Sequence, residues 1–74
     1  MFTKPMYKLL KTSKENGKNV VVHVGKNETF KGRIVDLTPY YITIKKNNQK
    51  KNEKDKVLTS YRTKWVRKAK EKNR

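Results

Sequence analysis

Hydrophobic and polar positions alternate most regularly in the middle of the chain. The period of two in VVVHV, residues 20–24, is typical of a β-strand with one face against a core. Turn-forming residues separate this segment from a second strand predicted over Thr29–Leu37, and Pro39 separates that strand from a third over Tyr40–Ile44. We expect the first two strands to pair as a hairpin. Because glycine inside a strand is costly, Gly32 predicts a sharp bend or a close approach of another backbone.

A short amphipathic helix is predicted ahead of these strands. Met6, Leu9 and Leu10 fall on one side at the spacing i, i+3, i+4, which indicates one or two helical turns. The pair Asn16-Gly17 is a helix stop before the first strand. Residues 1–5 are expected to form a mobile lead.

The second part of the chain has little apolar content. Residues 45–56 contain no apolar side chain, which predicts a basic loop or a long hairpin tip. Hydrophobic residues return at Val57-Leu58, at Tyr61 and at Trp65-Val66, which predicts two short strands. Residues 68–74 alternate in charge and are expected to fray as a basic tail.

The charge balance indicates a polyanionic partner. The chain has 21 lysines and arginines against 6 acidic residues, a formal net charge of +15 at pH 7. Residues 45–74 hold 13 of these basic residues and only 3 of the acidic ones. Such an excess favours association with nucleic acid or with an anionic surface, and it does not define a fold.

The length of the chain predicts a single domain with a thin core, since it has 74 residues of which 32% are hydrophobic. Domains of this size usually need an additional source of stability. There is no cysteine for a disulfide and no Cys/His cluster for a metal, so oligomerisation is the remaining source. The sequence has no long apolar run and no signal-like segment, so we expect a soluble, cytoplasmic protein with no membrane partner.

Three segments of this pattern resemble the opening of the Sm/LSm family, which includes the bacterial Hfq branch: Leu9-Leu10, residues 17–22 and residues 27–34. Residues 60–66 resemble the second Sm motif more loosely. The resemblance implies a mostly β fold, in which a short N-terminal helix is followed by a strongly bent five-stranded open barrel, with residues 1–74 as a single Sm-like domain. It also implies a homo-oligomer, a hexamer or heptamer, whose subunits join edge to edge into a ring that binds single-stranded RNA.

The resemblance places Tyr40 where the family has an aromatic or histidine side chain that stacks on an RNA base. Tyr40 is also an aromatic residue at a strand edge near basic residues, and base stacking contributes roughly 1–3 kcal/mol per base. Tyr41 takes this role if the strand register shifts by one residue. Arg62 matches the arginine of the second motif and, with Lys64 close behind, is expected to contact a base and phosphate. The structural alternatives are a tyrosine that fills the barrel end and a solvated arginine.

Two positions depart from the family pattern. When Gly32 is aligned, the aspartate of the first motif falls on Thr38, and the base-reading asparagine falls on Ile42. The Lys-His pair of the Hfq branch is absent as well. Because Ile42 has no amide to recognise uracil, stacking and phosphate contact remain as the main contributions to binding, with modest base preference.

The lysines of the basic loop are the expected phosphate contacts: Lys45, Lys46, Lys50, Lys51, Lys54 and Lys56. Contacts of this kind make binding strongly dependent on salt. The alternative is a solvated spacer whose charges prevent edge pairing. Trp65 is expected in the core, with a stacking platform as the alternative, and the lone His23 is expected to be structural or at the surface.

These observations disfavour an enzyme. The chain has one histidine, no cysteine, no glycine-rich phosphate loop and only scattered acidic residues, and no cofactor or metal is expected. An Sm-like RNA-binding ring protein is the interpretation that the sequence favours. The main alternative is a monomeric basic barrel that binds duplex DNA or a ribonucleoprotein particle, and a third is a small interaction protein with an acidic protein partner.

Overall fold

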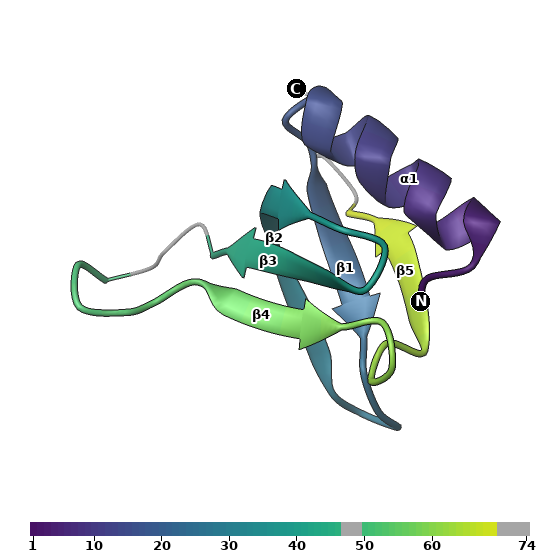
Figure 1. Cartoon of the computed structure of the whole chain (residues 1–74). Helices are drawn as coiled ribbons and strands as arrows, with labels where there is room; N and C mark the ends of the chain where they lie inside the picture. Colours follow the sequence, from purple (N-terminus) through teal and green to yellow (C-terminus); the bar gives the residue numbers. More distant parts are fainter. Residues whose placement is uncertain (47–49, 70–74) are drawn as a thin grey trace.

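The computed structural model describes residues 1–46 and 50–69 of the chain. In this part, one helix is followed by five strands: α1 Lys4–Glu15, β1 Asn19–His23, β2 Thr29–Leu37, β3 Tyr41–Lys45, β4 Lys56–Thr59 and β5 Trp65–Lys68 (Figure 1). The predicted mostly β architecture with a short N-terminal helix is confirmed. Residues 47–49 of the predicted basic loop and 70–74 of the predicted basic tail lie outside the described residues.

The strands form one antiparallel sheet in the order β4-β3-β2-β1-β5. The edge strands β4 and β5 do not pair with each other within the described residues, so the sheet is not closed into a barrel. The sheet is nevertheless bent, because Leu58 of β4 and Val66 of β5 belong to one core cluster although they come from opposite edges. The ammonium group of Lys56 likewise lies 5.1 Å from the ring centroid of Phe30 in β2, two strands away.

Gly32 lies where the backbones of β2 and β3 come close together. A Cβ atom on Gly32 would lie 2.5 Å from the carbonyl oxygen of Lys45 and 2.5 Å from Cγ2 of Ile44. Contacts this short leave no room for a side chain, which confirms the predicted close approach of another backbone. The register between the two strands shifts between Ile34 and Asp36, where β2 has an irregularity of the bulge type.

The helix is longer than the hydrophobic spacing predicted, because its ends are well capped. The side chain of Thr3 accepts a hydrogen bond from the backbone N–H of Met6 (3.4 Å), and Pro5 occupies the first turn, where a missing N–H costs nothing. At the other end, Asn16 is the C-cap and Gly17 adopts φ +64°, a left-handed conformation that glycine tolerates. The predicted helix stop at Asn16-Gly17 is therefore confirmed.

The expected mobile lead at residues 1–5 is wrong. Phe2 is buried in the core, and its backbone N–H donates to the carbonyl oxygen of Pro39 (2.8 Å). Thr3 and the next two residues already cap and begin the helix. An aromatic side chain so close to the terminus ties the start of the chain to the turn between β2 and β3.

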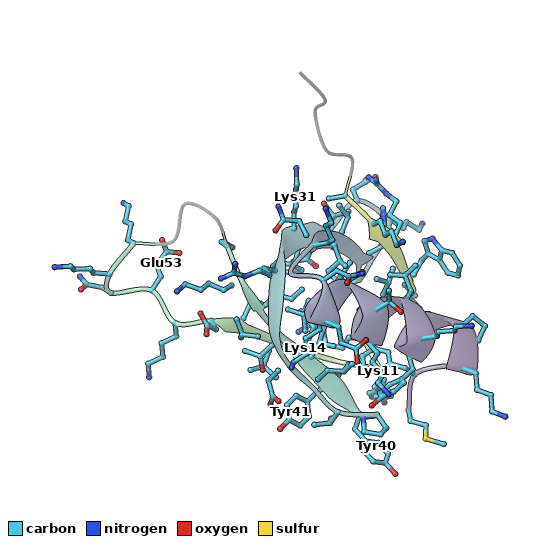
Figure 2. All side chains as sticks on the ribbon, turned by 90° about the horizontal axis from the view of Figure 1, so that it is seen from above. Lys11, Lys14, Lys31, Tyr40, Tyr41 and Glu53 are labelled. Atoms are coloured by element: carbon cyan, nitrogen blue, oxygen red, sulfur yellow. The ribbon has the colours of Figure 1, made fainter. Side chains whose placement is uncertain are left out.

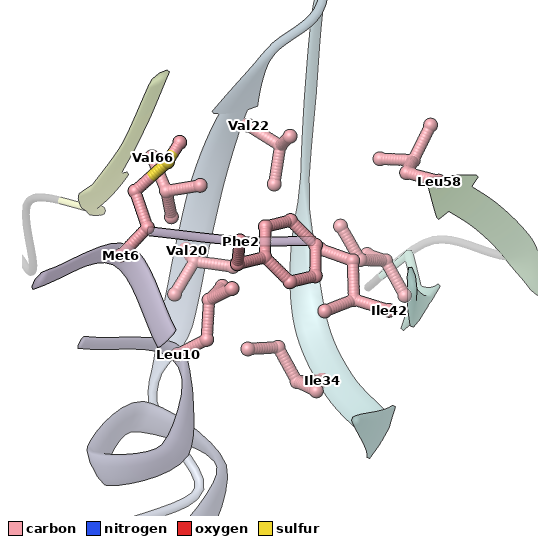
Figure 3. Packing of buried hydrophobic residues seen from close by; sticks show 10 residues of the cluster. Phe2, Met6, Leu10, Val20, Val22, Ile34, Ile42, Leu58 and Val66 are labelled. Atoms are coloured by element: carbon pink, nitrogen blue, oxygen red, sulfur yellow. The ribbon is translucent and has the colours of Figure 1, made fainter. Parts of the chain in front are cut away.

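The core lies between α1 and one face of the sheet (Figure 3). The helix packs across β2, β1 and β5, and it supplies Met6 and Leu10 to the core. The strands supply alternating apolar residues: Val20, Val22, Ile34, Ile42, Ile44, Leu58 and Val66. We call this the inner face of the sheet. Helix α1 has 12 residues, and no helix in the described ranges is long and apolar enough to cross a membrane.

Trp65 is not in the core, contrary to the sequence interpretation. Its side chain is 55% exposed, whereas its neighbour Val66 is buried. Successive side chains of a strand point to opposite faces, so only one of the two can face the helix. The opposite, outer face of the sheet therefore carries the tryptophan.

Candidate nucleic-acid interface

The turn between β2 and β3 meets the turn between β4 and β5 at one end of the sheet. The backbone N–H of Ser60 donates to the carbonyl oxygen of Tyr40 (2.8 Å), which joins the two turns directly. The carbonyl of the preceding Pro39 accepts from Phe2, so the same turn is also fixed to the start of the chain. The backbone that carries Tyr40 is thus held from both sides.

Thr38 organises the first of these turns. Its hydroxyl oxygen accepts from the backbone N–H groups of Tyr40 (3.1 Å) and Tyr41 (3.0 Å), and its own N–H donates to the carbonyl of Tyr41 (2.9 Å). Side-chain hydroxyls commonly stabilise turns in this way. Thr38 occupies the position where the Sm/LSm pattern has an aspartate, and in this chain its oxygen is engaged with the backbone of the tyrosines.

The second turn is closed by a buried threonine. Thr63 donates its hydroxyl to the carbonyl of Thr59 (2.8 Å), and Lys64 N–H donates to the carbonyl of His23 (2.7 Å) in β1. The side chains of Arg62 and Lys64 remain exposed on either side of Thr63. Arg62 and Lys64, which were predicted to contact a base and phosphate, therefore lie in the turn next to Tyr40.

Three tyrosines expose their rings in these two turns or next to them. The exposed fractions are 64% for Tyr40, 37% for Tyr41 and 90% for Tyr61. Figure 2 shows Tyr40 and Tyr41 projecting from the same side of the molecule. We call Tyr40, Tyr41, Tyr61 and Arg62 the tyrosine end. Sequence reasoning assigned Tyr61 to the apolar pattern, although its place between two short strands is a signal for an exposed turn residue.

A groove beside the tyrosine end was not predicted. It has a volume of about 400 Å³ and lies between the first turns of α1 and the β2–β3 turn, lined by Met1, Phe2, Lys4, Tyr7, Lys8, Lys11 and Pro39. Its three lysines recur at i, i+4 and i+7, so they share one face of the helix. This spacing is visible in the sequence, and it could have predicted a basic face on the helix. The lining of the groove thus combines apolar and aromatic side chains with three lysines.

We call residues 45–56 the lysine loop, and its described residues, 45–46 and 50–56, lie at the other end of β3 (Figure 1). Because β3 has five residues, its two end residues are roughly 13 Å apart. Of the predicted phosphate contacts, Lys45, Lys46, Lys50 and Lys51 are exposed there, and Glu53 closes a turn by accepting from the backbone N–H of Lys50 (3.0 Å). The structure therefore brings Tyr40, Tyr41 and Arg62 together and separates them from the four loop lysines.

Ile42 is fully buried in the inner face, where the family pattern has its base-reading asparagine. A buried aliphatic side chain cannot offer a hydrogen bond to a base edge. Within residues 1–46 and 50–69, no group of three or more His, Cys, Asp or Glu side chains gathers in a way that could hold a metal ion. The chemistry that these residues display is aromatic and cationic.

Comparison with known proteins identifies no relative: no protein-family model and no curated protein matches the chain. The fold of a short helix followed by a five-stranded antiparallel sheet is compatible with the Sm-like architecture.

Proposed function

We propose that this protein is an Sm-like RNA-binding protein that captures single-stranded RNA by base stacking and by phosphate contacts. The observation that carries the proposal is the tyrosine end, where three exposed tyrosines gather on a fixed backbone in a chain of net charge +15. Stacking on aromatic rings combined with a basic surface is the usual way in which proteins bind single strands without strong sequence preference. The lysines of the groove and of the lysine loop supply the phosphate contacts.

The exposed rings favour a single strand over a duplex. In a duplex the faces of the bases are stacked on one another, so a tyrosine ring gains contact only where a base is free. Basic side chains alone serve either ligand equally well. Duplex DNA therefore remains the alternative ligand that the charge supports and the tyrosines do not.

The two edges of the sheet support assembly into a ring as part of this proposal. Among the residues that the structure describes, β4 and β5 each pair on one side only, and each strand has four residues. Unpaired strand edges are templates for pairing with another chain, and a closed ring satisfies all of them at once. A hexamer or heptamer formed by β4 of one subunit and β5 of the next is the assembly that we propose.

The binding proposal is tested with labelled oligonucleotides. Fluorescence anisotropy with a single-stranded RNA, and with duplex RNA and DNA of the same length, is measured at two salt concentrations. We expect the single strand to bind more tightly than either duplex at both salt concentrations, with a steep salt dependence for all three. Tighter binding of duplex DNA would overturn the proposal in favour of the DNA-coating alternative.

The assembly is tested separately by light scattering at moderate salt. A ring predicts a mass several times the 8.8 kDa of one chain. A stable monomer at micromolar concentration would exclude the ring. It would not decide whether the chain binds RNA, which the oligonucleotide titration measures separately.

A further inference from the structure

The outer face of the sheet carries a second set of aromatic and basic side chains. Trp65 of β5 lies opposite His23 of β1 in the strand register, and Arg67 lies opposite Val21. On the other side of β1, Val21 lies opposite Lys31 of β2. Directly opposed residues on one face have their Cβ atoms about 5 Å apart, so these side chains form a continuous surface across three strands.

The tryptophan and its neighbours are accessible and partly fixed. Trp65 is 55% exposed, and the side chains of Arg67 and Lys31 are exposed as well. The Nε of Arg67 donates to Nε2 of His23 (3.3 Å), which holds the guanidinium group beside the tryptophan's cross-strand partner. Val21 is buried, and in the strand register it lies between Arg67 and Lys31, whose long side chains can cover apolar surface.

This surface is basic, and part of it lies on the side of the molecule away from Tyr40 and Tyr41. At the outward positions of β5, β1 and the first part of β2 there is no acidic residue among those that the structure describes: Trp65, Arg67, Asn19, Val21, His23, Thr29, Lys31 and Arg33. Figure 2 shows Lys31 on the side of the molecule opposite to Tyr40 and Tyr41. A strand bound at the tyrosine end therefore does not cover Lys31.

We propose that this outer face is a second binding surface for single-stranded nucleic acid. Trp65 stacks on a base, and Arg67 and Lys31 contact the phosphates on either side of Val21. An exposed tryptophan beside cationic side chains on one face of a sheet is complementary to an unpaired base and its backbone in both shape and charge. The inference rests on the proposed function for its class of ligand and adds a site over β5, β1 and the first part of β2.

The chain contains a single tryptophan, so its fluorescence reports on the surroundings of Trp65. Addition of an unlabelled single-stranded RNA to the full chain is expected to quench the emission of Trp65 and to protect it from acrylamide. The anisotropy of a labelled copy of the same RNA measures binding to the whole protein in parallel. If the RNA binds by anisotropy while Trp65 stays unquenched and equally accessible, the second surface is excluded and the proposed function stands. If the labelled RNA does not bind at all, both proposals fall.

Substitutions identify the groups involved. Trp65→Ala is expected to weaken RNA binding about 5- to 150-fold, the range of one base–aromatic stack, and Trp65→Phe to restore most of it. Arg67→Gln is expected to flatten the salt dependence by about 0.7 of a logarithmic unit per logarithmic unit of salt, whereas the matched control Lys14→Gln, on the helix, is expected to leave it unchanged. Tyr40→Ala is expected to leave the quenching of Trp65 intact, and circular dichroism checks that each variant is folded.

If this face binds another copy of the chain and not RNA, the fluorescence of Trp65 gives a different result. If the emission of Trp65 depends on protein concentration and not on RNA, the surface is an interface between copies of the chain, and the nucleic-acid proposal is overturned. Equal RNA binding by folded Trp65→Ala and the parent would overturn it as well.

Discussion

The two ends of β3 differ in the chemistry of their side chains and in how their backbone is held. At the tyrosine end the backbone is held by Phe2 on one side and by Ser60 on the other, and the side chains are aromatic. At the lysine loop the side chains are cationic and stand on a long hairpin connection. Stacking depends on the position and angle of a ring, whereas charge acts over about 8–10 Å at ordinary salt. In the proposed RNA complex, stacking therefore needs the fixed backbone of the tyrosine end, whereas lysines can contact phosphates from a loop.

The largest effect is expected from removing the anchor of the tyrosine end. Phe2→Ala deletes a buried aromatic ring and is expected to lower the free energy of unfolding by about 3–5 kcal/mol, measured by urea denaturation. The matched control Tyr61→Ala truncates an aromatic residue that is almost fully exposed and is expected to change stability by less than about 0.5 kcal/mol. Equal stability of Phe2→Ala and the parent would mean that the ring of Phe2 contributes nothing to the core.

The next effect concerns stacking itself. Tyr40→Ala is expected to weaken the binding of single-stranded RNA by about 1–3 kcal/mol without changing the salt dependence, because a ring is lost and no phosphate contact is. Anisotropy titrations at several salt concentrations measure both quantities. If Tyr40→Ala binds RNA as tightly as the parent while Tyr61→Ala binds it more weakly, the stacking residue lies in the β4–β5 turn instead.

Local sequence pattern predicted most of the fold. The strand over Thr29–Leu37 was predicted with the bounds that the structure has, because alternation and turn residues are both local signals. The burial of Phe2 and the exposure of Trp65 were missed for a common reason. Which side of a strand or terminus faces the core depends on the helix that packs there, and Trp65 and Val66 are both plausible core residues until that contact is known.

The candidate site was predicted only in part for a related reason. Tyr40, Tyr41 and Arg62 were chosen from sequence, but the hydrogen bond between Ser60 and Tyr40 joins turns that are 20 residues apart and has no local signature. The groove between α1 and Pro39 depends on the same kind of long-range contact. Residue types are therefore predictable from the chain, whereas their grouping requires the fold.

The lysine loop is expected to respond in the opposite way to the tyrosine end. Each of Lys45, Lys50 and Lys51 changed to Gln is expected to weaken binding about fourfold near 0.15 M salt and to flatten the salt dependence by about 0.7, since one counterion-releasing contact is lost. The loss should be the same for every RNA sequence tested. Stability is expected to stay within about 0.5 kcal/mol, because these side chains are exposed. An unchanged slope in the triple variant would show that the loop is only a solvated spacer.

The smallest effect is expected for the identity of the base. Ile42 is fully buried, and the hydroxyl of Thr38 is engaged with the backbone of Tyr40 and Tyr41, so neither of the positions where the Sm/LSm pattern reads uracil can offer a free hydrogen bond. Stacking accepts every base, and phosphate contacts do not distinguish bases. U-rich and A-rich oligonucleotides of equal length should therefore differ less than about fivefold in affinity at each of two salt concentrations. Hundredfold preference for uridine would require a reading group outside the tyrosine end, and the side chains of the groove beside α1 would be the first to substitute.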